Sequence, residues 1–216
     1  MRRSAVLCGT VTVGLVLLTA AGAPAASGPS TQSVPDKEFV AQLSPLNAGA
    51  HTVAGTTYTI PSASGTAVIT VNGDDITVTV DVQGVTAGTL HPQHIHAGTT
   101  CPNASDDVNH DSFVDVIEGL PKYGPVLIPL DSNLNSFAPS LAFPVADASG
   151  SYHYSEEASK SHLQSELKQA LKLGDRHVVI HGINPTDPLP TTVASLPGLP
   201  AWATLPVACG ELSQSR

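Results

Sequence analysis

Residues 67–82 read AVITVNGDDITVTVDV, and this stretch decides the fold class. From Ile76 to Val82, apolar residues alternate with polar ones, so a strand formed here has one apolar face and one polar face. The Asn72-Gly73 pair separates this run from a second β-branched run and favours the positive φ angles of a type I′ hairpin turn. The stretch therefore predicts two antiparallel strands that bury one face and expose the other.

The rest of the chain continues this pattern in short runs. Residues 57–60 and 178–180 read as strands, and Gly and Pro punctuate the sequence without a repeating strand–helix–strand rhythm. One helix is expected at 161–173, where leucines recur on one face and Gly174 stands at the end. Residues 184–206 carry six prolines and read as a long loop. We therefore expect an all-β protein, an antiparallel β-sandwich with one inserted helix and long loops.

The composition excludes several classes of protein. Of the 216 residues, 41% are hydrophobic and only 12% are charged, against about 25% charged in an average domain, so neither a disordered chain nor a coiled coil fits. The formal net charge of -9 leaves no basic face to neutralise phosphates. No nucleic-acid partner is therefore expected.

The beginning of the chain has the three parts of a secretory signal. A short basic start is followed by an apolar run at 6–18 and by Ala-Pro-Ala at 23–25, a small-residue cleavage signal. The alternative is a buried N-terminal helix; the run is too short for a membrane span, which needs about 20 residues. We predict a signal peptide at 1–26, a flexible leader at 27–36 and one domain at 37–216, in a protein that is secreted to an extracellular or periplasmic space.

Removal of this signal peptide leaves two of the three cysteines. Cys8 is lost with the signal, and Cys101 and Cys209 remain. Two cysteines in an exported chain predict one disulfide, and two free thiols are the alternative.

The nine histidines include two pairs whose spacing suits a strand. His94 and His96 are two residues apart, and His177 and His181 are four apart, so each pair shares one face of its strand. Neutral imidazole is a common ligand of copper and zinc. The pairs indicate a metal site, and the alternative is a polar strand face that carries histidines.

Three segments resemble the copper/zinc superoxide dismutase family. Residues 82–96, VQGVTAGTLHPQHIH, are similar to the family's copper-site strand, which reads G-L-x-x-G and then L-H-x-x-H-V-H. The hairpin at 66–82 precedes it as in that family. Residues 176–181, RHVVIH, and 205–210, LPVACG, resemble the family's later strand and its final strand, in the same order along the chain.

This resemblance implies a Greek-key, immunoglobulin-like sandwich of the superoxide dismutase type with a copper site. By position, His94, His96 and His181 match the copper ligands. His91 matches a histidine that supports the site without binding the metal, and we assign His177 to a similar supporting role. The implied activity is the dismutation of superoxide by copper that cycles between two oxidation states.

The chain also departs from the family pattern. Cys101 and Cys209 match the family's structural disulfide, but His110 is the only histidine that could replace its metal-bridging ligand. The family's zinc ligands have no clear counterpart, so zinc is not expected. Pro206 stands where the family has an arginine over the copper, and Arg176 is a substitute for it only by conjecture. Catalytic activity is therefore left open, while the copper-binding prediction is less affected.

A second, shorter resemblance suggests a function without catalysis. His94-Ile95-His96, followed by residues 123–126, YGPV, and by Leu130, is similar to CHRD domains, which are extracellular β domains. This resemblance implies a non-catalytic extracellular module in which a metal is structural or absent.

Residues 107–118, DVNHDSFVDVIE, have the spacing of an EF-hand calcium loop. Oxygen ligands at positions 1, 3, 5, 7, 9 and 12 can surround one calcium ion. These positions hold the side chains of Asp107, Asn109, Asp111, Asp115 and Glu118 and the carbonyl of Phe113. Position 6, normally glycine, is Ser112. We expect a structural calcium loop inside a β domain, and the alternative is a solvated acidic turn.

Overall fold

The computed structural model describes residues 34–215. The predicted signal peptide and most of the predicted leader lie outside the described residues. Within 34–215, no helix is long and apolar enough to cross a membrane.

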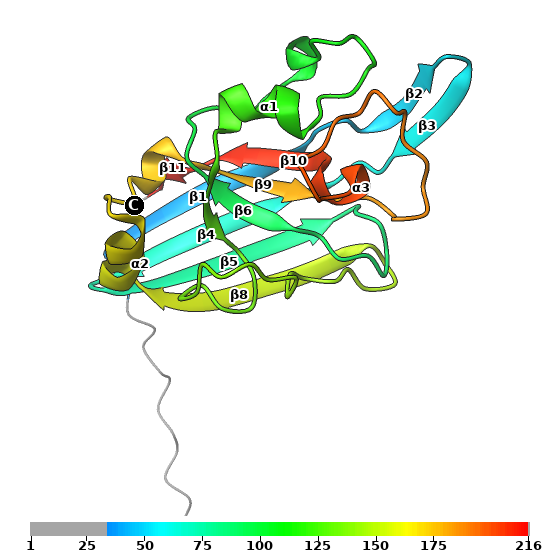
Figure 1. Cartoon of the computed structure of the whole chain (residues 1–216). Coiled ribbons are helices and arrows are strands. Elements are labelled where there is room, and N and C mark those ends of the chain that lie inside the picture. The colour runs from blue at the N-terminus through cyan, green and yellow to red at the C-terminus, as the bar shows by residue number, and fades with distance from the viewer. Residues whose placement is uncertain (1–33, 216) are drawn as a thin grey trace, which may run out of the picture. The chain divides into compact units, whose positions relative to one another are not determined.

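One antiparallel sheet of nine strands curls into two layers (Figure 1). The first layer contains β1 (Lys37–Pro45), β4 (Ser64–Asn72), β5 (Asp75–Gln83), β8 (Ser151–Ser159) and the short β11 (Ser213–Gln214). The second contains β10 (Pro206–Glu211), β9 (His177–His181), β6 (Gln93–His96) and β7 (Val126–Pro129). The strand order is β7-β6-β9-β10-β1-β4-β5-β8, and β1 joins the layers because it pairs with both β4 and β10. The predicted all-β sandwich is confirmed.

The core lies between these layers. Ile69 of β4 is paired with Val78 of β5, and both side chains are buried, as the alternating pattern predicts. Ile95 and Ile180 of the second layer belong to the same buried cluster. Each such side chain contributes about 1.5–3 kcal/mol to the folding free energy when it is fully buried. These buried apolar side chains therefore hold the two layers together.

The hairpin between β4 and β5 forms, and its loop lies within the turn predicted at Asn72-Gly73-Asp74. Asn72 pairs with Asp75, so the two loop residues are Gly73 and Asp74. Gly73 has φ 62°, whereas Asp74 is not among the residues with positive φ. Glycine with positive φ at the first central position is typical of a type II′ turn, so the predicted type I′ turn is wrong. The Asp74 carboxylate accepts the hydroxyl of Ser159 at 2.6 Å, which holds this residue in the loop.

A second hairpin stands outside the main sheet. Strands β2 (Gly49–Val53) and β3 (Thr56–Ile60) pair only with each other and extend away from the sandwich (Figure 1). The predicted strand at 57–60 belongs to this hairpin.

Among residues 34–215, three short α-helices replace the single inserted helix that was predicted. They are α1 (Val116–Tyr123), α2 (Lys160–Leu167) and α3 (Ala201–Thr204), with 3-10 turns η1 (Ala104–Asp106) and η2 (Leu173–Asp175). The predicted helix at 161–173 is shorter than expected, because Lys168 adopts a left-handed conformation with φ 52° and ends α2. Leu171 and Leu173 still reach the core, but from an irregular segment and η2. The spacing of these leucines therefore resembles that of a longer amphipathic helix, although the helix ends before them.

A buried hydrogen bond connects the two layers, and its removal should destabilise the sandwich. The Tyr152 hydroxyl of β8 donates to Gln93 Oε1 of β6 at 3.1 Å, and Gln93 is fully buried. In Tyr152→Phe this oxygen loses its donor, so we expect the free energy of unfolding in urea to fall by about 1–3 kcal/mol. Adding Gln93→Met should recover part of the loss, because both polar partners are then gone. Unchanged stability in Tyr152→Phe would contradict the prediction.

Candidate metal centre

The histidines of β6 and β9 lie on the face of the second layer that points away from the main core. Ile95, Val178 and Ile180 belong to the main core, so the alternating residues of both strands face the other way. The two strands are neighbours in antiparallel register, with His96 opposite His177 and His94 opposite Val179. Two segments far apart in the sequence thus present their histidines on one surface.

Three of these histidines form a compact triangle. One ring nitrogen from each of His94, His96 and His181 lies within 4.8 Å of the other two. The ring centroids are 5.4 Å apart for His94 and His181 and 5.8 Å apart for His96 and His181. Within 34–215, no other group of three or more His, Cys, Asp or Glu residues brings its ligand atoms together in this way. The spacing is suitable for a single ion.

Backbone carbonyls fix which ring nitrogens face this triangle. His96 Nδ1 is 2.9 Å from the carbonyl of Gly124, and His181 Nδ1 is 2.8 Å from the carbonyl of Thr204. A carbonyl only accepts, so both Nδ1 atoms carry the hydrogen and both Nε2 atoms are left with a free lone pair. These Nε2 atoms, and Nδ1 of His94, are buried without a hydrogen-bond partner. Three unpaired nitrogens are the donor set that a metal ion requires.

Burial keeps these imidazoles neutral. Burial, together with the neighbouring histidines, lowers the pKa of His96 to about 4 and that of His181 to about 3. The pKa of His94 is also well below its usual range, mainly because of burial and then because of His181 and His96. Metal ions bind the neutral form, so the ligands need no deprotonation at neutral pH.

Two helices supply the carbonyls that orient the ligands. Gly124 follows the end of α1, and Thr204 is the last residue of α3. Gly124 has φ 68°, and a Cβ there would lie 2.7 Å from the backbone nitrogen of Gly98, so only glycine suits this junction. Tyr123 of α1 is fully buried and packs on His96, with ring centroids 4.7 Å apart. The histidine pattern gave no signal for Gly124, Thr204 or Tyr123.

The two histidines predicted to support the site lie beside the triangle. The His91 ring is buried, and its Nδ1 is 3.1 Å from the backbone carbonyl of His181, so it contacts the strand rather than the ligand ring. His177 is stacked on His96 with ring centroids 6.0 Å apart, and burial lowers its pKa to about 4. Neither belongs to the group of three.

The structure does not bring the other two residues considered for this site to the triangle. His110 lies in an exposed loop with φ 58° and is not part of the group. The Arg176 guanidinium is bound to the backbone carbonyls of Ala97 and Leu171. Arg176 is therefore held by backbone carbonyls, and after burial its charge is the next cause that lowers the pKa of His177, which is not one of the three.

The predicted disulfide is confirmed. Cys101 and Cys209 are joined across 108 residues, with Cα atoms 5.8 Å apart. Cys209 belongs to a small apolar cluster with Val179 and Tyr123, on the same face of β9 as the histidines. The bridge thus fixes the segment after β6 against β10 next to the candidate metal centre.

The residues predicted to bind calcium lie between Cys101 and the first turn of α1. Their carboxylates accept hydrogen bonds from backbone N–H groups of the loop. They are not gathered as closely as the three imidazoles. Asp115 has become the N-cap of α1, with Oδ1 accepting from Ile117 and Glu118.

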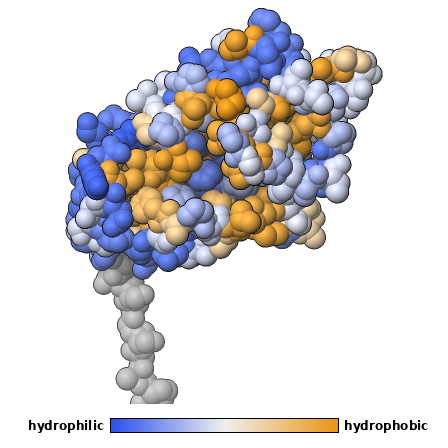
Figure 2. Space-filling model, viewed as in Figure 1, coloured by the Kyte–Doolittle hydropathy of each residue, from blue (hydrophilic) through white to orange (hydrophobic). Residues whose placement is uncertain are grey.

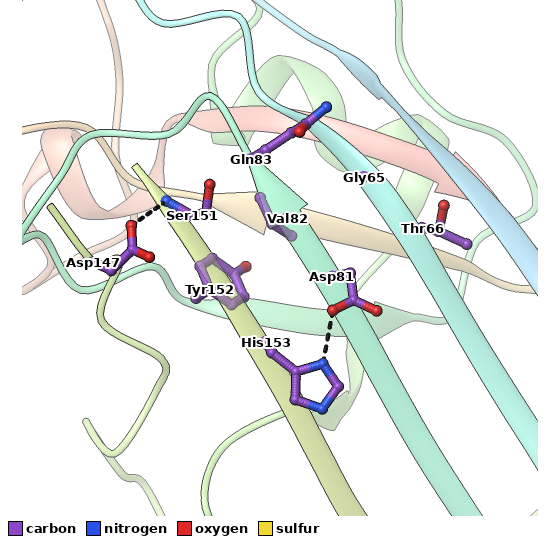
Figure 3. A pocket seen from close by; sticks show the side chains of 9 residues that line it. All are labelled: Gly65, Thr66, Asp81, Val82, Gln83, Asp147, Ser151, Tyr152 and His153. Atoms are coloured by element: carbon purple, nitrogen blue, oxygen red, sulfur yellow. Dashed lines mark hydrogen bonds and ion pairs between the residues drawn. The ribbon is translucent and has the colours of Figure 1, made fainter. Parts of the chain in front are cut away.

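A separate hollow lies over β4, β5 and β8 (Figure 3). Its most polar feature is the pair of Asp81 and His153, whose atoms are 2.7 Å apart while the side chains are 65% and 63% exposed. An ion pair this exposed contributes about 0–1 kcal/mol. The hollow has one histidine and two acidic residues that are not grouped as ligands, so the triangle is the stronger candidate.

The face of the molecule seen in Figure 2 has separate apolar and polar areas. Phe143 packs against the His94 ring with centroids 5.3 Å apart, and the nearby chain positions Leu141 and Val145 are exposed. The partly exposed ligand therefore lies next to an aromatic ring.

No protein-family model matches the chain, and no curated protein matches it. The assignment of the candidate metal centre therefore rests on the geometry of its own residues.

Proposed function

We propose that this protein binds one copper ion through His94 Nδ1, His96 Nε2 and His181 Nε2. The observation that carries the proposal is the set of three buried ring nitrogens without partners, which lie within 4.8 Å of one another. Imidazole suits copper, zinc, iron and nickel, and among divalent ions of this series copper binds most tightly. The resemblance to copper/zinc superoxide dismutases supports the same choice.

The protein prepares this site before any ion arrives. The carbonyls of Gly124 and Thr204 hold two rings in one tautomer, and burial keeps the rings unprotonated. Tyr123 excludes water from one side of His96, and Phe143 packs on His94. The ligands therefore lose little freedom on binding, which favours affinity. Bound copper would supply one-electron chemistry, including the dismutation of superoxide.

A second candidate is a secreted, non-catalytic module of the CHRD kind, in which the metal is structural. The observations that favour it are the exposed position of His110 and the use of Arg176 by backbone carbonyls. In the described part of the chain, neither a bridging histidine nor an arginine over the metal is therefore in place to take part in catalytic turnover. Export of the chain, suggested by its beginning, is part of both candidates, and the disulfide is consistent with it.

One experiment separates these candidates. The protein is purified without added metal, its copper, zinc and calcium are measured, and superoxide dismutation is assayed before and after copper loading. One copper per chain with dismutation supports the first candidate. One copper per chain without activity supports the second, and no uptake of copper or zinc would overturn the metal centre itself.

Loss of one ligand should weaken metal binding sharply. His94 is the least buried ligand, so His94→Gln should fold normally. We expect its Cu²⁺ dissociation constant, measured by competition with a chelator, to rise at least about 100-fold, the upper range for losing a mere supporting residue. His153→Gln is the matched control, because that ring is exposed on the other layer. Equal affinity in His94→Gln and the unaltered protein would refute the assignment.

A further inference from the structure

The loop that precedes α1 closes on itself through its acidic and amide side chains. Asp107 accepts backbone N–H groups of Asp111 at 3.1 Å and Ser112 at 2.8 Å, and Asn109 Oδ1 also accepts from Asp111 at 2.9 Å. Glu118 Oε1 returns to the start of the loop and accepts the N–H of Asn109 at 3.0 Å. Side-chain oxygens from both ends of the loop are thus held close to the same short segment.

One oxygen of this loop is buried without a partner. Asp111 is 6% exposed, and its Oδ1 accepts the N–H of Phe113 at 2.9 Å. Oδ2 of the same carboxyl group is buried and has no hydrogen-bond partner, the only such carboxylate oxygen among residues 34–215. Oδ2 belongs to the carboxyl group whose Oδ1 is bonded to the N–H of Phe113, so it lies within the same loop. A buried anionic oxygen without a donor indicates a cation.

We propose that this loop binds one calcium ion. The proposed ligands are the side-chain oxygens of Asp107, Asn109, Asp111 and Glu118 and the carbonyl oxygen of Phe113. Their positions, 1, 3, 5, 12 and 7 of a twelve-residue loop, are those from which oxygen ligands surround calcium. Ser112 has φ 74°, so the sharp turn at position 6 is present although glycine is absent.

The structure changes one ligand of the expected set. Asp115, at position 9, caps α1 through Oδ1 and accepts the N–H of Ala194, outside the loop, through Oδ2 at 2.6 Å. The carboxylates of Asp107, Asp111 and Glu118 accept only N–H groups of the loop itself. Position 9 often acts through a water molecule, so a loop without this direct ligand remains suitable. Calcium fits better than Mg²⁺, which requires a near-ideal octahedron at shorter distances.

This calcium site is separate from the proposed copper centre and does not depend on it. A transition metal is disfavoured at this site, because the proposed ligands are all oxygen atoms. The site has a structural role, because it includes Glu118 in the first turn of α1. The residue after that helix, Gly124, provides the carbonyl that orients His96.

Thermal unfolding of the metal-free protein tests the proposal. The protein is treated with EDTA, dialysed, and heated with and without about 5 mM CaCl2. For a dissociation constant of about 0.5 mM, within the range of extracellular calcium modules, Tm should rise by about 3–6 °C. Calorimetric titration should give one site per chain, and MgCl2 at the same concentration should shift Tm by less than half as much. No shift with calcium would overturn the proposal.

Three variants show where the calcium acts. Asp111→Asn keeps the shape of the side chain and removes its charge, so the dissociation constant should rise at least tenfold and the shift in Tm should fall to about a third or less of its size in the unaltered protein. Asp147→Asn is the matched control, because Asp147 also accepts turn N–H groups, those of Ser149 and Ser151, but lies elsewhere. His94→Gln should keep the full shift. An undiminished shift in Asp111→Asn, or a lost shift in His94→Gln, would place the calcium elsewhere and overturn the proposal.

Discussion

Replacement of both Cys101 and Cys209 by alanine is expected to lower the Tm of the protein by about 10–20 °C. The disulfide spans 108 residues, and in the chain-entropy model a loop of this size stabilises the folded state by about 4–5 kcal/mol. In a domain of this size, each kcal/mol changes Tm by about 2–4 °C. Among residues 34–215, we therefore expect this disulfide to be the covalent cross-link that contributes most to the free energy of unfolding.

Calorimetry under non-reducing conditions measures this difference. The unaltered protein in excess dithiothreitol provides an independent comparison, because reduction should lower Tm by a similar amount without any change of sequence. Thr100→Ala serves as a control for substitution beside the bridge. A double variant whose Tm stays within about 3 °C of the unaltered protein would show that packing around Val179 and Tyr123 holds this region without the covalent link.

The sandwich could be predicted where one strand face is buried and the other exposed. The alternation from Ile76 to Val82 has period two, and the paired strand β4 buries the matching residues. The turn between them was placed correctly but given the wrong type, because Asp74 does not adopt the positive φ that a type I′ turn needs at its second central residue. The helix at 161–173 was overextended because Leu171 is buried from an irregular segment.

The candidate metal centre was predictable for a related reason. His94 and His96 share a strand face by spacing alone, and His181 joins them because β6 and β9 are neighbours. The parts that sequence could not supply are backbone carbonyls. Any residue has a carbonyl, so the sequence does not show that Gly124 and Thr204 orient the ligands until the helices are placed, although residues 123–126 belong to the shorter resemblance.

The metal-free protein is expected to lose about 2–6 kcal/mol of folding free energy between pH 7 and pH 5. Burial lowers the pKa of His96 and His177 to about 4 and that of His181 to about 3, whereas unfolded histidines titrate near 6.5. Below about pH 6.5 the unfolded chain takes up protons that the folded protein refuses, so its free energy falls relative to the folded state. Each such histidine contributes about 2 kcal/mol across this interval. One such contribution gives the lower end of the expected loss in folding free energy, and three give the upper end.

Urea unfolding of EDTA-treated protein at pH 7, 6 and 5 measures this loss. The interval lies above the usual pKa values of carboxyl groups, so the histidines dominate the change. His181→Gln removes one buried imidazole, and its loss between pH 7 and pH 5 should be smaller by about 2 kcal/mol. His153→Gln should leave the loss unchanged, because that ring is largely exposed. Equal stability at pH 7 and pH 5 would mean that the imidazoles accept protons in the folded state, and the neutral, pre-oriented ligand set would have to be abandoned.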